Sequence, residues 1–83
     1  MGEQIKAVMA RIFELPIGQI SDDATIESVP EWDSLKHLEL MLELEAEFSI
    51  VIPAATMLEL LSYDEIERHV SGLVFVATDD GSD

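Results

Sequence analysis

Residues 32–53 read WDSLKHLELMLELEAEFSIVIP, and this stretch contains the strongest helical pattern of the chain. Leu, Glu, Met and Lys, which are all good helix formers, dominate it from about Ser34 to Phe48. Asp33 stands directly before the helix, where a carboxylate can accept hydrogen bonds from the free N–H groups of the first turn. The sequence therefore predicts a helix with Asp33 as its N-cap and Ser34 as its first residue.

This helix has one charged stripe, and apolar side chains cover most of its remaining surface. At about 100° per residue the stripe comprises Lys36, Glu39, Glu43 and Glu47. Like charges at i, i+4 spacing disfavour a helix slightly, and a solvated face usually mixes its signs. The stripe is therefore either a docking face for basic protein surfaces or the ordinary solvated face of an acidic protein.

The segment before this helix predicts an amphipathic first helix and then a long loop. Apolar residues recur at helical spacing from Glu3 to Glu14. Residues 15–32 break the pattern with two prolines and a glycine. A loop of this length is uncommon in a small domain unless it is pinned, and a short helical turn is expected over 22–25. Four side chains are expected to point inward from the loop: Ile17, Ile20, Ile26 and Val29.

The segment after the helix predicts two further helices and a polar end. A short helix is expected over 54–61, and Ser62 with Glu65 forms a capping-box pattern that starts a last helix. The last helix is expected to turn three side chains inward: Tyr63, Ile66 and Val70. The fold class is thus all-α, a four-helix bundle with a long first loop and a short third helix. We expect a single domain over residues 1–76 and a disordered acidic tail over 77–83.

The composition disfavours some classes of function and favours others. With 83 residues the chain has room for one modest core and little room for an enclosed catalytic pocket, which favours a binding or carrying role. Eighteen acidic residues against four basic ones give a net charge of −14, which disfavours nucleic acid and membrane partners. The chain has no cysteine, so any thiol chemistry requires an added group. A monomeric, cytoplasmic protein is expected.

The quoted stretch also contains a set of short motifs at defined spacing. These are Trp32-Asp33-Ser34-Leu35, Leu38-Glu39-Leu40, Leu44-Glu45, Phe48 and Ile52-Pro53. Together they resemble the phosphopantetheine-attachment region of acyl and peptidyl carrier proteins, and the resemblance extends from the first helix to about Val70. A phosphodiester on Ser34 would also suit the positive end of the helix dipole.

The resemblance implies a carrier protein and not an enzyme. A phosphopantetheinyl transferase would move 4′-phosphopantetheine from coenzyme A to Ser34, with Asp33 and Leu35 completing the attachment motif. The terminal thiol of the arm would hold acyl groups as thioesters, so that the protein serves partner enzymes as a cosubstrate. Acyl-loading and acyl-modifying enzymes with basic patches would dock on four acidic residues: Glu39, Glu43, Glu45 and Glu47. No catalytic or metal-ligating residues are expected.

Several positions depart from the carrier pattern. Carriers often have glycine shortly before the Asp-Ser-Leu motif and after the aromatic residue, whereas this chain has Glu31-Trp32 and Ser49. A serine in a left-handed helix cap costs more than glycine, so we expect the helix to end differently. Lys36, close to the attachment position, could change which transferases and partners accept the protein. These departures favour a specialised pathway, such as one for polyketide, modified-sugar or lipid precursors.

Two other interpretations stay open. An aminoacyl or peptidyl carrier would have the same arm but an adenylating loading enzyme. An acidic helical adaptor would bind a basic protein without the arm, and Ser34→Ala would leave its function intact. The start at Met1 and the polar end suggest a discrete carrier, and a piece of a larger synthase is the alternative. Of the remaining residues, Trp32 is expected to pack the loop, and His37 to be a half-exposed helix residue near the arm.

Overall fold

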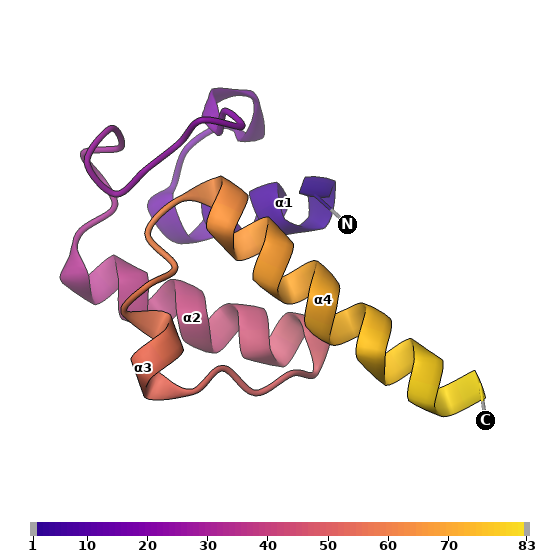
Figure 1. Cartoon of the computed structure of the whole chain (residues 1–83). Helices are drawn as coiled ribbons and strands as arrows, with labels where there is room; N and C mark the ends of the chain where they lie inside the picture. The colour runs from indigo at the N-terminus through magenta and orange to yellow at the C-terminus, as the bar shows by residue number, and fades with distance from the viewer. Residues whose placement is uncertain (1, 83) are drawn as a thin grey trace.

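The computed structural model describes the backbone of residues 2–82 and the side chains of residues 2–73. The described residues form four α-helices and one short 3₁₀ turn, without a β-strand, so the all-α prediction is confirmed (Figure 1). The elements in chain order are α1 (Gly2–Phe13), η1 (Ile17–Gln19), α2 (Ser34–Phe48), α3 (Ala54–Met57) and α4 (Tyr63–Ser82).

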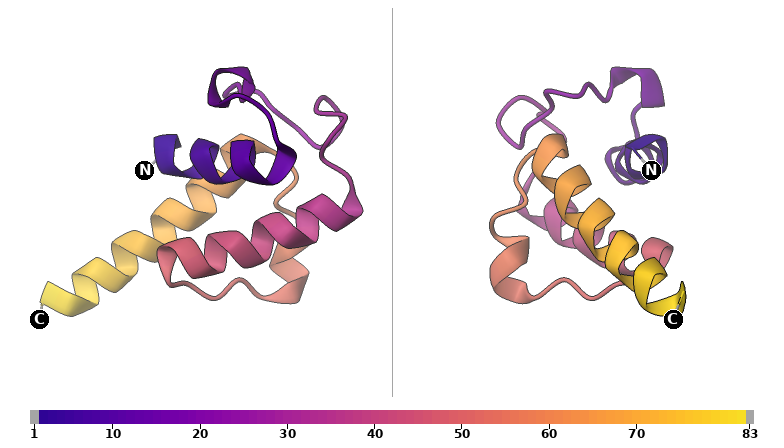
Figure 2. Two further views of the ribbon diagram at one scale, coloured as in Figure 1. Left: turned by 180° about the vertical axis from the view of Figure 1, so that it is seen from behind. Right: turned by 45° about the vertical axis from the view of Figure 1, so that its right-hand side comes forward.

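The longer helices pack against one another through their apolar faces. α1 and α2 lie side by side in opposite directions, and α4 crosses them (Figure 2). The single turn of α3 lies beside the first turns of α2 in both views (Figure 2). This arrangement brings the start of α2, the loop that precedes it and α3 to one end of the molecule.

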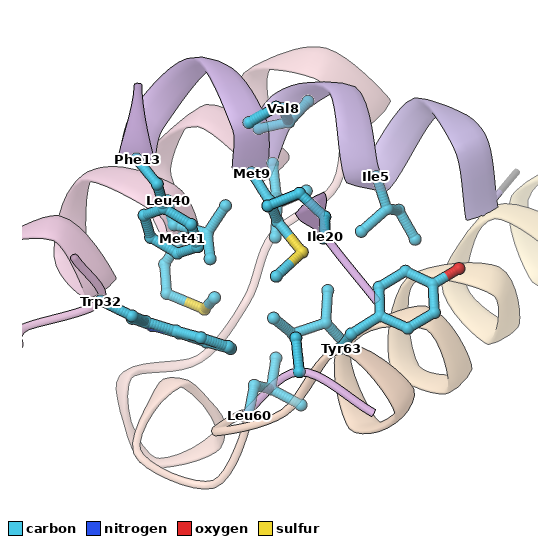
Figure 3. Close-up of a cluster of buried hydrophobic side chains, with 14 of the residues drawn as sticks. Ile5, Val8, Met9, Phe13, Ile20, Trp32, Leu40, Met41, Leu60 and Tyr63 are labelled. Carbon is cyan, nitrogen blue, oxygen red and sulfur yellow. The ribbon is translucent and has the colours of Figure 1, made fainter. Parts of the chain in front are cut away.

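One hydrophobic core joins all the longer segments. Figure 3 shows side chains from α1, α2, the loop and α4 meeting in one cluster. Ile5 and Met9 of α1, Leu40 of α2 and Ile66 of α4 are fully buried. Trp32 extends this core from the loop and is only 2% exposed, which confirms its packing role. Large buried side chains of this kind each contribute about 1.5 to 3 kcal/mol by leaving water.

The long loop is pinned by apolar side chains and by backbone hydrogen bonds. Ile20 and Val29 are buried and Ile26 is half-buried, as expected. The prediction for Ile17 is wrong, because this residue opens the 3₁₀ turn η1, whose side chains all remain outside the core, and it is 50% exposed. The helical turn therefore lies at η1 and not over 22–25.

Two backbone hydrogen bonds attach the loop to the segment before α4. The Ile26 N–H donates to the Leu61 carbonyl at 2.9 Å, and the Tyr63 N–H donates to the Ala24 carbonyl at 2.9 Å. After Met57 the i→i−4 hydrogen bonds of a helix stop, because the Glu59 N–H donates to the Thr56 carbonyl at 2.9 Å and the Leu61 N–H donates to the Glu59 carbonyl at 3.0 Å. The third helix is consequently shorter than the predicted 54–61.

The last helix begins as its capping box predicts. The Glu65 N–H donates to Ser62 Oγ at 3.2 Å, and the Ser62 hydroxyl donates to Glu65 Oε1 at 3.0 Å. Its inward side chains are those expected from the sequence: Tyr63, Ile66 and Val70. The helical backbone extends to Ser82, but side chains beyond residue 73 lie outside the described residues. The disordered tail over 77–83 therefore stays a prediction.

A candidate attachment site at the start of α2

Ser34 is the first residue of α2 and is exposed. Asp33 before it has extended backbone angles, and its Oδ1 accepts from the Lys36 N–H at 2.9 Å. The predicted N-cap is thereby confirmed, and the Asp33 carbonyl accepts from the His37 N–H at 2.8 Å as the first helical bond. Because a helix start presents free N–H groups and positive partial charge, a phosphodiester on Ser34 would be electrostatically favoured.

An apolar pocket opens directly beside Ser34. Its volume is about 520 Å³, and it lies between α2, α3, the segment that follows α3 and Ile26 of the long loop. Ser34 and His37 supply the polar part of its lining. The apolar walls are formed mainly by Leu38, Met41, Ala54, Met57, Leu58 and Leu61. A volume of this size is sufficient for a small apolar group, since ligand pockets usually span about 300 to 1,000 Å³.

His37 is buried between the loop and α3, so the expectation of a half-exposed residue is wrong. Its side chain is 9% exposed. The Trp32 indole Nε1–H donates to His37 Nδ1 at 3.0 Å, and His37 Nε2 lies 2.7 Å from the Met57 carbonyl oxygen. The Trp32 ring also contacts Phe13, with ring centroids 5.3 Å apart. His37 shares its helical phase with the buried residues Leu40, Met41 and Leu44, but the sequence did not show which apolar face of this helix is buried.

The charged stripe of α2 lies along α1. Glu43 Oε2 is 2.6 Å from the Nη2 atom of Arg11 in α1. Lys36 Nζ is 3.8 Å from Glu14 Oε2 and 3.9 Å from Glu39 Oε1. These pairs are partly exposed to solvent, so each contributes little to stability by itself. The stripe is therefore partly neutralised within the fold.

The other two acidic candidates have different surroundings. Glu45 is half-buried, and its Oε2 accepts from the Ile52 N–H at 2.7 Å, which ties the segment after α2 to the helix. Glu47 is exposed. Leu35, which follows the attachment serine, is 65% exposed, and Leu38 and Leu42 continue this exposed apolar row along α2. Ser34, Asp33 and Leu35 thus lie together, whereas the acidic candidates are distributed along the helix.

These features define a small helical domain with an exposed serine beside an apolar pocket. The serine stands at a helix start, where a negatively charged group is electrostatically favoured. The model of the family described as "Phosphopantetheine attachment site" matches residues 3–70. The chain belongs to this family, whose members are carriers and whose prosthetic group is covalently attached 4′-phosphopantetheine. No match was found among curated proteins. Within the described residues, no helix is long and apolar enough to cross a membrane.

Proposed function

We propose that the protein is an acyl carrier protein and that Ser34 is the residue modified with 4′-phosphopantetheine. The exposed hydroxyl of Ser34 at the first position of α2 is the observation that supports this assignment best. Asp33 holds the helix start in place through its bond to the Lys36 N–H, so the serine has a fixed position for a transferase. When attached, the group supplies a terminal thiol that binds an acyl group as a thioester.

The pocket beside Ser34 supports an apolar acyl cargo. Apart from Ser34 and His37 its walls are Leu, Met, Ile and Ala side chains, and among the described residues no acidic, lysine or arginine side chain lines it. An aminoacyl cargo has a charged ammonium group, which would lose its hydration in such a lining without gaining a partner. Within the carrier family the pocket therefore favours the acyl interpretation over the aminoacyl one.

Partner enzymes with basic patches are part of the same proposal. All four Lys and Arg residues of the chain are ion-paired inside the fold, while the net charge is −14. The pairs are Lys6 with Asp22, Arg11 with Glu43, Lys36 with Glu14 and Glu39, and Arg68 with Asp64. The surface offered to a partner is consequently acidic, and basic protein surfaces would meet it faster at low salt. On α2, Glu47 is the most accessible of the candidate docking residues.

Intact mass tests the attachment. The protein is incubated with coenzyme A and a broad-specificity phosphopantetheinyl transferase, beside Ser34→Ala and the control Ser71→Ala, a serine in α4. We expect a gain of one phosphopantetheine in the wild type and in Ser71→Ala, and no gain in Ser34→Ala. No gain in any protein with several transferases would favour the helical adaptor, and a gain that persists in Ser34→Ala would place the group elsewhere.

A further inference from the structure

The ring of His37 connects three parts of the structure through two hydrogen bonds, and these bonds define its tautomer. An indole N–H is only a donor, so the Nδ1 atom that accepts from Trp32 has no proton. In the neutral ring the proton is then on Nε2, which donates to the Met57 carbonyl. One buried imidazole therefore links α2 both to the loop before Ser34 and to the end of α3.

α3 has few other attachments to the rest of the molecule. It is a single turn, Ala54–Met57, and none of its residues is buried. Met57 packs against the core only partly, and Leu58 immediately after it is 74% exposed. Hydrophobic burial of α3 is thus small, which gives the hydrogen bond from His37 a large share in fixing this turn.

α3 forms part of the lining of the pocket. Ala54, Met57 and Leu58 line it from α3 and its C-cap, and His37, Leu38 and Met41 line it from α2. Ser34, Ile26 of the loop and Leu61 complete the lining. Met41 is fully buried in the core, so the α2 wall is held by the main packing of the domain. The separation of α3 from α2 therefore contributes to the width of the pocket.

We propose that His37 is a positioning residue that holds α3 against the start of α2 and so sets the width of the apolar pocket for an acyl chain attached at Ser34. Trp32 orients the ring through its N–H, so that Nε2–H is directed at the Met57 carbonyl. The identity of the occupant rests on the proposed function, whereas the connection between His37 and α3 is a property of the unmodified protein.

The first experiment uses the unmodified protein. His37→Phe keeps an aromatic ring but removes both ring nitrogens, and His69→Phe is the matched control. His69 Nε2 has no hydrogen-bond partner among the described residues, so the control removes no bond recorded in the structure. We expect amide exchange at Met57 and Glu59, whose N–H groups bond within this turn, to accelerate by about tenfold in His37→Phe only.

A second variant tests the contribution of the indole N–H. Trp32→Phe removes the indole N–H and retains an aromatic ring against Phe13, so it should accelerate exchange in α3 by a smaller factor than His37→Phe. Because Trp32 is also part of the core, exchange at amides of α1 and α2 is followed in each variant, and only an acceleration in α3 that exceeds theirs supports the proposal. Unchanged exchange in α3 in both variants would overturn the proposal.

The final experiment examines the occupant. Wild type, His37→Phe and His69→Phe are loaded with octanoyl-phosphopantetheine, and hydroxylamine cleavage of the thioester is followed by mass. We expect cleavage in His37→Phe to be several-fold faster than in the other two, because a displaced α3 exposes the chain to solvent. Equal cleavage in all three would overturn the role of His37 in the pocket. Absence of loading in every protein would instead count against the proposed function and leave the exchange experiment to decide the positioning role.

Discussion

Ser49 ends α2 in the left-handed region, with φ 54° and ψ 48°. Its N–H donates to the Glu45 carbonyl, and so does the N–H of Ile50, at 3.1 Å. Glu14 ends α1 with a similar φ of 58°. The expectation that α2 ends differently because it lacks glycine is therefore wrong, since the bonds to the last helical carbonyls are made despite the cost of the side chain. For an L-residue that cost is roughly 1 to 2 kcal/mol.

Ser49→Gly is predicted to stabilise the protein. Glycine adopts a positive φ without the Cβ clash, and part of this gain is offset by the greater freedom of glycine in the unfolded chain. We expect the free energy of unfolding to rise by about 0.5 to 1 kcal/mol in urea titrations. Ser71→Gly in the interior of α4 is the control and should destabilise by about 0.5 to 1 kcal/mol. A lower stability of Ser49→Gly would show that the serine side chain itself holds the cap.

The difference between Asp33 and His37 shows which residue roles the sequence reveals. The capping role of Asp33 depends on a backbone N–H three residues away, so local sequence was sufficient to predict it. His37 bonds to a carbonyl twenty residues away and to an indole in the loop. No spacing rule connects these partners, because their meeting depends on where α3 packs.

Helix α2 has two apolar faces, of which one is buried and the other is exposed. Its buried residues are His37, Leu40, Met41 and Leu44. The exposed apolar row is Leu35, Leu38 and Leu42. Helical spacing predicted the helix and its charged stripe correctly. It did not distinguish the core face from the exposed one, because that choice depends on how α1 and α4 pack against the helix.

Glu45 is predicted to stabilise the segment after α2. Its carboxylate accepts from the Ile52 N–H, and Ile52 is 2% exposed, so Glu45→Ala leaves a backbone donor without its partner. We expect a loss of about 1 to 2 kcal/mol in the free energy of unfolding. Glu47→Ala, at an exposed position two residues later, should change it by less than about 0.5 kcal/mol.

The modification rate separates this structural role from docking. If Glu45 mainly bound partner enzymes, Glu45→Ala would slow phosphopantetheinylation more at low salt than at high salt. The variant would then have the same free energy of unfolding as the wild type. That result would contradict the assignment of Glu45 to the fold and move it to the docking surface with Glu47.

One cluster of side chains joins α1, the long loop and α4 across the molecule. Lys6 of α1 bonds to the carboxylate of Asp22 in the loop, and its Nζ lies 5.0 Å from the centroid of the Tyr63 ring at the start of α4. Gly2 leaves room for the Tyr63 side chain, because a Cβ at that position would lie 2.4 Å from the Tyr63 hydroxyl oxygen. The sequence predicted the loop and the inward Tyr63. It did not predict that a lysine, an aspartate and a tyrosine from three segments would meet.

This cluster predicts a loss of stability at alkaline pH. The hydrogen bond to Asp22 raises the pKa of Lys6 above 10.5, and burial raises the pKa of Tyr63 above 10.0. Both groups therefore keep their protons to a higher pH in the folded state than in the unfolded state. Their contribution to stability is complete below the unfolded-state pKa values and is lost as the pH rises through the folded-state values. The free energy of unfolding should consequently fall above about pH 10.

The variants Tyr63→Phe and Asp22→Asn test the origin of this decline. Tyr63→Phe removes the phenol that titrates, and Asp22→Asn removes the carboxylate that raises the pKa of Lys6. Urea unfolding at a series of pH values from neutral to alkaline should show a smaller decline in each variant and the smallest decline in the double variant. Because the two groups belong to one cluster, their effects need not add. A decline in the double variant as large as in the wild type would assign the alkaline loss to general repulsion among the acidic residues, not to the contact that joins α1, the loop and α4.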